Sequence, residues 1–136
     1  MIEILYLASQ IQCDANSPLI NVQVDVYHHQ ALVKTMSLED RLLLPVNSVN
    51  DLTFQYRFLD SSCTPVTPTQ VLLAPQDPVP AVPAAYDQQS IQQLLNGLES
   101  YEELFLVELG TTNTSSTAYN LQDVVFIVNK NPIFPD

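Results

Sequence analysis

Apolar and polar side chains alternate at every second residue in two segments of this chain, and this pattern restricts the fold more than any other feature. Three valines between residues 22 and 26 alternate with more polar side chains, and four large apolar side chains do the same between residues 52 and 58. Successive side chains of a β-strand point to opposite faces of the sheet. The alternation therefore predicts strands that bury one face in a core.

Two further segments, residues 104–107 and 124–128, are apolar without alternation. A continuous apolar run of strand length is typical of a strand that is covered on both faces. We therefore expect central strands here, or strands whose outer face meets another subunit. Shorter strand candidates are residues 2–8, 31–36, 41–46 and 70–74. About eight strands, many of them spaced by about 8–12 residues, are typical of a sandwich or barrel.

One amphipathic helix is expected near residues 87–98. The apolar residues at 91, 94, 95 and 98 have the i, i+3, i+4, i+7 spacing of a helix that buries one face. Asp87 suits the N-cap position, and Tyr86 and Ile91 then occupy the two positions of a hydrophobic staple.

Six prolines lie between Pro65 and Pro83. Because proline fixes φ and lacks an N–H donor, residues 65–83 are predicted to form an extended crossover that holds at most an edge strand at 70–74. We therefore predict a single domain over residues 1–136, an all-β antiparallel sandwich of about seven to nine strands with one short inserted helix. The alternative is an α+β fold in which the helix packs on an open sheet.

Glycine occurs only at Gly97 and Gly110. Gly-rich phosphate loops are therefore excluded. Asn and Asp are the residues left to build turns, because they tolerate left-handed backbone angles. We expect loops longer than the tight two-residue hairpins that Asn-Gly pairs make.

The chain carries 15 acidic and 4 basic side chains, a formal net charge of −11. It lacks the cationic surface that nucleic-acid binding requires, and an anionic membrane surface would repel it. No apolar run approaches the ~20 residues of a membrane-spanning helix, and Glu3 lies where a signal peptide would carry a basic residue. We therefore expect a soluble, cytoplasmic protein without a nucleic-acid or membrane partner.

Cys13 and Cys63 are the only cysteines. A disulfide between them is possible, but two reduced thiols are the expectation for a cytosolic domain of this size. Their separation does not match the spacing of a zinc or redox motif. The segment Asn113-Thr114-Ser115 matches the N-glycosylation sequon, a match without meaning in a protein that is not secreted.

Carboxylates at loops or strand ends are candidates for a calcium site, although no Asp-x-Asp pair occurs in the chain: Asp14, Asp51, Asp60 and Asp123. Two histidines, His28 and His29, are the only candidates for a base at neutral pH. Neither a Gly-x-Ser-x-Gly nor a His-Glu-x-x-His motif is present. We assign no catalytic residue and no cofactor.

Two groups of residues are candidates for contacts with a protein partner. Prolines of an extended segment can bind an aromatic groove, although wrapping the sandwich is the commoner role for such a segment. Carboxylates that follow a helix are unfavourable beside the negative end of its dipole, so they are expected to face solvent or a cationic partner. The residues concerned are Pro75, Pro78, Pro80, Pro83, Glu99, Glu102 and Glu103.

Our leading functional hypothesis is a non-catalytic interaction or assembly domain that associates with itself. Gln, Asn, Ser and Thr occupy 40 positions, and a neutral polar surface of this kind loses little solvation free energy when a partner covers it. The two continuous apolar strands also favour self-association, because their outer faces can meet another subunit. A calcium- or carbohydrate-binding sandwich module is the alternative, and a small hydrolase that uses Cys or His is a third hypothesis.

Overall fold

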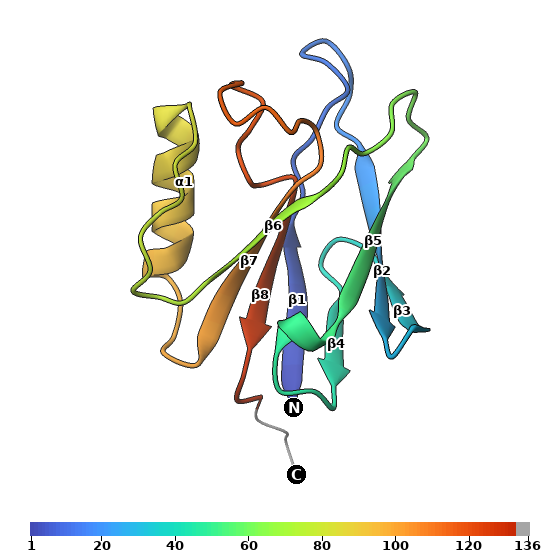
Figure 1. Ribbon diagram of the computed structural model, residues 1–136, viewed down its shortest axis with the longest axis vertical. Coiled ribbons are helices and arrows are strands. Elements are labelled where there is room, and N and C mark those ends of the chain that lie inside the picture. Colours follow the sequence, from blue (N-terminus) through green and yellow to red (C-terminus); the bar gives the residue numbers. More distant parts are fainter. Residues whose placement is uncertain (133–136) are drawn as a thin grey trace.

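The computed structural model describes residues 1–132. Eight strands and one α-helix make up the fold (Figure 1). The elements are β1 (Ile2–Ala8), β2 (Asn21–His28), β3 (Ala31–Met36), β4 (Arg41–Leu44), the short 3-10 helix η1 (Val49–Asp51), β5 (Thr53–Leu59), β6 (Thr69–Leu73), α1 (Ala85–Asn96), β7 (Glu102–Glu108) and β8 (Val124–Asn129).

The strands form two sheets in which all neighbours are antiparallel. One sheet has five strands in the order β4-β1-β8-β7-β6, and the other has three in the order β3-β2-β5. The main core lies between the two sheets and includes Ile4, Val24 and Phe126. The predicted mostly-β, sandwich-like fold with one short helix is confirmed. The helix packs on the outer face of the five-stranded sheet. Packing of the helix on a sheet was the feature that the α+β alternative predicted.

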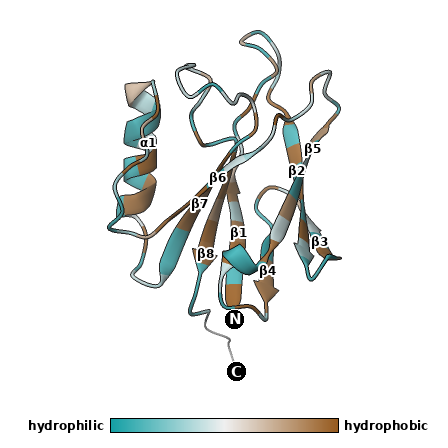
Figure 2. Cartoon of the chain, viewed as in Figure 1, coloured by the Kyte–Doolittle hydropathy of each residue, from teal (hydrophilic) through white to brown (hydrophobic). Residues whose placement is uncertain are grey.

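The two continuous apolar segments are β7 and β8, and both lie inside the five-stranded sheet, as predicted. Phe105 and Phe126 point into the sandwich core, whereas Leu104 and Leu106 belong to a second buried cluster with Ile91 of α1. The apolar character of the two strands is visible beyond the glutamates at the start of β7 (Figure 2). Their outer face is thus covered by a helix of the same chain, so no second subunit is needed to explain it.

The helix begins two residues before Asp87, and the expected N-cap at Asp87 is wrong. The N-cap residue is Ala84, whose extended backbone (φ −87°, ψ 123°) follows Pro83 and whose side chain makes no capping bond. Asp87 lies in the first turn, where a carboxylate still interacts favourably with the helix dipole. Alanine has the highest helix propensity, so Ala85 extends the helix without a polar cap.

The Pro-rich segment holds an edge strand, β6, and then a strap, residues 74–84, that runs back along α1 (Figure 1). Val82 is buried in the cluster beneath α1, and Val79 packs against the same cluster. These contacts agree with the wrapping role of this segment. The four candidate prolines all lie on the strap, half-buried or exposed: Pro75, Pro78, Pro80 and Pro83.

The β2–β3 hairpin contradicts the expectation of longer loops. Only His29 and Gln30 lie between the two strands, and both have positive φ, 51° and 66°. Positive φ at both central residues is the requirement of a tight hairpin turn, normally met by Asn-Gly. The hairpin is therefore closed by two residues that adopt the left-handed region at a steric cost.

Cys13 and Cys63 form a disulfide, so the expectation of two reduced thiols is wrong. The bond joins the loop that follows β1, in one sheet, to the loop that follows β5, in the other. The two loops meet only because the sheets face each other, and 50 residues separate the cysteines along the chain. Within the described residues, no helix combines the length and apolar character that crossing a membrane requires.

Candidate functional site

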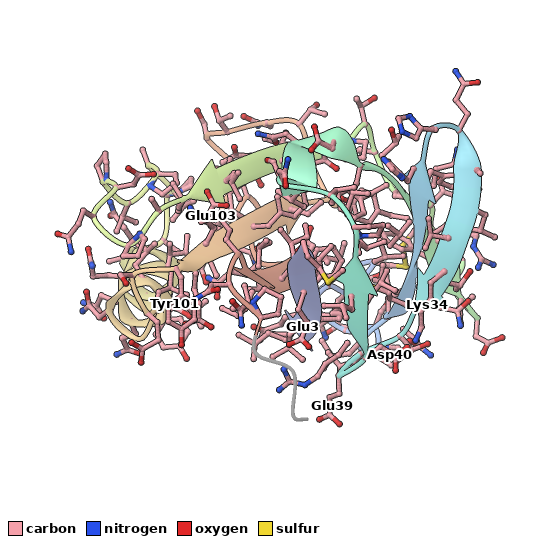
Figure 3. The ribbon with its side chains drawn as sticks, turned by 90° about the horizontal axis from the view of Figure 1, so that it is seen from below. Glu3, Lys34, Glu39, Asp40, Tyr101 and Glu103 are labelled. Carbon is pink, nitrogen blue, oxygen red and sulfur yellow. A yellow bond between two sulfur atoms is a disulfide. The ribbon has the colours of Figure 1, made fainter. Side chains whose placement is uncertain are left out.

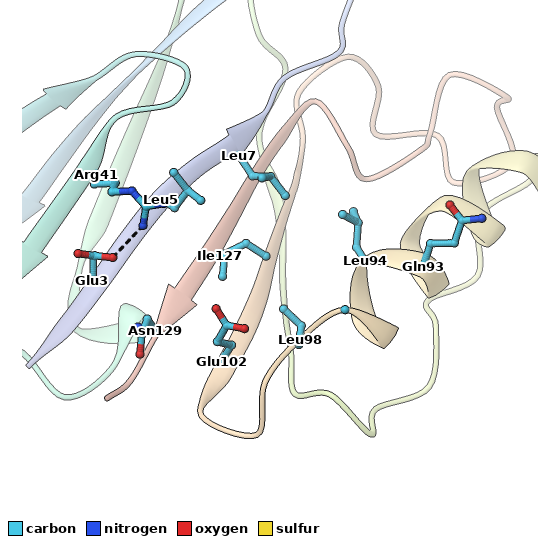
Figure 4. Close-up of a pocket in the computed structure, with 11 residues that line it drawn as sticks. Glu3, Leu5, Leu7, Arg41, Gln93, Leu94, Leu98, Glu102, Ile127 and Asn129 are labelled. Carbon is cyan, nitrogen blue, oxygen red and sulfur yellow. Dashed lines mark hydrogen bonds and ion pairs between the residues drawn. The ribbon is translucent and has the colours of Figure 1, made fainter. Parts of the chain in front are cut away.

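A cavity of about 340 Å³, which we call the groove, lies between α1 and the outer face of β1 and β8 (Figure 4). Leu5 and Leu7 of β1 and Ile127 of β8 line it from the sheet, and Leu94 and Leu98 line it from the helix side. Leu7 keeps 38% of its surface exposed. The groove is thus an apolar surface that remains open to solvent.

The period of β1 determines which side chains reach the groove. Ile2, Ile4 and Tyr6 are fully buried in the sandwich core, so Leu5 and Leu7 must face the opposite side of the sheet. The helix covers β7 and β8 there, and of β1 only Ala8 packs against the cluster beneath the helix. The sequence analysis did not identify these leucines. The unbroken apolar run at residues 4–7 was the available signal, because such runs indicate a strand with partners on both faces.

Charged groups surround the groove. Arg41 Nη1 lies 3.1 Å from Glu3 Oε1 across the β1–β4 pair (Figure 4). Glu102 lines the groove from the start of β7, and its Oε1 accepts a hydrogen bond of 2.8 Å from the backbone N–H of Glu99. Two carboxylates and one guanidinium therefore border the groove, with the amides of Gln93 and Asn129, and the formal charge of this border is negative.

The acidic character continues over the adjoining end of the molecule. Viewed from that end, the four acidic residues Glu3, Glu39, Asp40 and Glu103 are spread across the surface together with the basic residue Lys34 (Figure 3). Lys130 Nζ approaches Glu103 Oε1 to 4.0 Å. Of the three glutamates predicted as interaction residues, Glu102 lines the groove, while Glu99 and Glu103 are its chain neighbours. None of the four predicted prolines lines it.

A second polar arrangement lies at the opposite end of the sandwich, where residues 110–123 connect β7 to β8. Glu108 is fully buried and accepts backbone hydrogen bonds from Gly110 (2.9 Å), Asn120 (2.9 Å) and Leu121 (3.2 Å). Leu121 has a φ of 58°, a left-handed conformation that is costly for leucine. The Glu108 carboxylate therefore holds the end of the loop in a strained turn.

Asp123 completes this arrangement. Its Oδ2 accepts hydrogen bonds from the backbone of Leu109 (2.7 Å) and Gly110 (3.0 Å), and its carboxyl group bonds to Glu108. Burial, and then the hydrogen bond to Glu108 and the charge of Glu108, raise the pKa of Asp123 to about 9. A Cβ on Gly110 would lie 3.2 Å from Glu108 Oε2, so glycine allows the backbone to approach both carboxyl groups. Asp123 therefore stays protonated at neutral pH.

The burial and hydrogen bonds of Glu108 and Asp123 indicate a structural role for this pair. Only 2% of Asp123 and none of Glu108 is exposed, and backbone N–H groups occupy their oxygens. These bonds fix the loop of residues 110–123 onto the end of β7. The sequence analysis missed Glu108, because a glutamate at the end of an apolar strand carries no motif.

The calcium candidates do not converge on one site. Asp14 and Asp123 line a cleft of about 390 Å³ beside the loop of residues 110–123, whereas Asp60 does not line that cleft and Asp51 lies in η1 at the other end of the sandwich (Figure 1). Asp87 lines the same cleft, and its pKa is raised by burial and then by the charge of Glu108. Over residues 1–132, no three His, Cys, Asp or Glu side chains are arranged to hold a metal ion.

The residues considered for a hydrolase are also separated. The disulfide occupies both cysteines, which removes the proposed thiol nucleophile. The rings of His28 and His29 lie beside each other at the β2–β3 turn, with their centres 3.9 Å apart and their planes tilted by 35°. Neither histidine lines the groove or the cleft. Comparison of the chain with protein-family models, with curated proteins and with solved structures found no match.

Proposed function

We propose that this protein is a non-catalytic interaction domain whose groove binds a segment of another protein, one that places apolar side chains between basic residues. The observation that carries the proposal is the pairing of an open apolar surface with an acidic border. This proposal keeps the class expected from the sequence and gives it a location.

The apolar part of the groove supplies the affinity. Full burial of a leucine side chain contributes about 1.5–3 kcal/mol. Leu7 is the most open leucine of the groove, and Leu43 on the adjacent edge strand β4 keeps 40% of its surface exposed. An extended or helical segment with two or three apolar side chains could cover Leu5, Leu7 and Ile127 together.

The charge of the border selects the partner. Glu3, Glu102 and Arg41 together give the border a net charge of −1, and Glu102, which has no cationic partner in the groove, favours a Lys or Arg of the bound segment. A second copy of this chain is disfavoured, since each copy carries a net charge of −11 and would bring the same acidic end to the contact. The coverage of β7 and β8 by α1 also removes the main reason to expect self-association.

The test is selection from a library of random peptides displayed on phage, with the full chain as the immobilised target. We expect the recovered peptides to combine Leu, Ile or Phe with Lys or Arg. Isothermal titration calorimetry of one such peptide against the variant Leu7→Gln should give an affinity lower by roughly tenfold, because one apolar contact of about 1.4 kcal/mol is lost.

The matched control is Leu32→Gln. Leu32 is exposed on β3 in the other sheet, and the substitution leaves the net charge unchanged in both variants. Its peptide affinity should equal that of the parent chain. Equal binding by the parent and Leu7→Gln, or recovery of peptides without basic residues, would contradict the proposal. If analytical ultracentrifugation shows a dimer at micromolar concentration, the occupant of the groove would be a second copy of this chain and not a segment of another protein.

Carbohydrate binding is a second candidate, and the cleft beside the loop of residues 110–123 favours it. Gln12 and Asn120 line this cleft with Asp14, and Tyr86 at its edge is 79% exposed. Amides and carboxylates beside an exposed aromatic ring are the groups that bind sugar hydroxyls and stack on sugar faces. A glycan array tests this function, and binding that survives Tyr86→Ala would argue against it.

A further inference from the structure

The loop that joins β7 to β8 contains the sequon Asn113-Thr114-Ser115. This loop lies at the end of the sandwich away from the N-terminus (Figure 1). Its base is held by the buried pair Glu108 and Asp123, while the sequon itself lies in the part that faces solvent. A motif of this kind acquires meaning only if its asparagine can be reached and if the protein passes through the right compartment.

The first condition is met by exposure and hydrogen bonding. Asn113, Thr114 and Ser115 are all exposed. The Oδ1 atom of Asn113 accepts a bond of 3.0 Å from the backbone N–H of Ser115. Among the described residues, no acceptor receives a hydrogen bond from Nδ2 of Asn113. The amide nitrogen of the side chain is therefore presented to solvent, and the hydroxyl required two residues later is present at Ser115.

The second condition is addressed by the disulfide. Cys13 and Cys63 are bonded, and such bonds form and persist in the secretory pathway, outside the cell or in a periplasm, while the cytosol keeps thiols reduced. The expectation of reduced thiols followed from the expected cytoplasmic location, so the disulfide argues against that location. The disulfide thus supports the compartment in which the sequon can be used, and it lies in different loops from the sequon.

We propose that Asn113 is an acceptor for N-linked glycosylation in an oxidising secretory compartment. The donor is an oligosaccharide attached through a diphosphate to a lipid. The Nδ2 atom of Asn113 attacks the anomeric carbon of the first sugar, the bond from that carbon to the phosphate oxygen breaks, and the lipid diphosphate leaves with the electron pair. Nδ2 loses one proton, so an asparagine and a lipid-linked oligosaccharide become an N-glycoside, a lipid diphosphate and a proton.

The position of the glycan keeps it apart from the groove. Glu3, Glu102 and Asn129 border the groove at the start of β1, the start of β7 and the end of β8. Because the strands are antiparallel, the loop of residues 110–123 joins the other ends of β7 and β8. Glycosylation at Asn113 thus neither depends on the groove nor closes it.

The test is expression of the full chain behind a cleavable signal peptide in a eukaryotic cell line. Protein recovered from the cells and the medium is then treated with a peptide amidase that releases N-glycans. We expect a heavier species that the amidase converts to the mass of the unmodified chain, with Asn113 changed to Asp in the peptide mass spectrum. Ser115→Thr should keep the modification because it keeps the hydroxyl.

Ser115→Ala should abolish the modification while leaving Asn113 in place, and Asn113→Gln should abolish it as well. Thiol titration of every sample establishes that the disulfide has formed and that the variants fold. The proposal is overturned if disulfide-bonded protein from the secretory pathway carries an unmodified Asn113. It is equally overturned if the added mass persists in Asn113→Gln.

Discussion

The substitution Asp123→Asn tests whether the buried Asp123, which directly precedes β8, is protonated at neutral pH. An amide at this position can donate to Glu108 as the protonated acid does, and its oxygen can still accept the backbone bonds of Leu109 and Gly110 (2.7 and 3.0 Å). Asn therefore mimics the protonated Asp123 at every pH. We expect the variant to lose a pH dependence that the parent chain has.

The size of the effect follows from the pKa. Burial and Glu108 raise the pKa of Asp123 from 3.8 to about 9. Between these values the folded state holds a proton that the unfolded state releases, so the stabilisation is complete below pH 3.8 and declines as the pH rises towards 9. The free energy of unfolding falls by about 1.4 kcal/mol per pH unit, or by up to about 4 kcal/mol between pH 5 and pH 8.

Urea denaturation at pH 5, 6, 7 and 8, followed by circular dichroism, measures this slope. The parent should be most stable at pH 5, and Asp123→Asn should show a flatter profile and exceed the parent at pH 8. Asp87, Glu108 and Tyr119 are the other titratable groups of this region and are present in both proteins, so the difference between the two profiles reports on the coupled pair of Asp123 and Glu108. Parallel profiles for the two proteins would refute the raised pKa of Asp123.

The substitution Glu108→Gln, in the other residue of the buried pair, should lower the stability that Asp123→Asn raises at pH 8. Glu108 accepts three backbone hydrogen bonds, so an amide must turn a donor towards at least one backbone N–H. Leaving a buried donor unsatisfied costs about 1–3 kcal/mol. The variant should be destabilised at every pH, including pH 8, where Asp123→Asn is stabilised. If the two substitutions changed the free energy of unfolding equally, the change would reflect lost packing and not the different hydrogen-bonding roles of Glu108 and Asp123.

Two further predictions concern the turn and the disulfide. Gln30→Gly should raise the free energy of unfolding by about 1 kcal/mol in urea denaturation, because glycine adopts a φ of 66° without the steric cost that Gln30 bears; an unchanged midpoint would place Gln30 outside the left-handed region. Cys13→Ser combined with Cys63→Ser should lower it by about 4 kcal/mol, the loop entropy of a 50-residue closure. The reduced parent chain should unfold at the same urea concentration as this double variant, and a difference between them would show that the serines disturb the loops.

The strands could be predicted because their burial repeats along the chain. Val22, Val24 and Val26 are buried as the alternation required, and β7 and β8 lie inside the sheet as their unbroken apolar runs required. Each of these patterns depends only on the geometry of the strand itself. Leu94 and Leu98 were expected in the core and are half-buried, because they extend beyond the covered strands into the groove.

The remaining features depend on contacts between segments that are distant in sequence. Cys13 meets Cys63 only after the two sheets pack together, and neither cysteine has a local signal of pairing. Glu108 and Asp123 lie 12–14 residues from four of the five backbone N–H groups that complete their hydrogen bonds, such as the Leu109 N–H for Asp123. Tight turns of this kind usually contain glycine, but Gln30 occupies this one. The alternating pattern of the two flanking strands sets their pairing register, and the turn residues adopt positive φ to fit it.

The position of α1 links the fold to the proposed function. Its apolar face, with Ile91 and Leu95, is used on β6, β7 and β8, and the helix is too narrow to cover β1 as well. The strands that suggested self-association are therefore satisfied within the chain, while the leucines of β1 are left open beside the helix. The same packing that removes one docking surface creates another, and the acidic border of the new surface points to a basic partner segment in place of a second acidic copy.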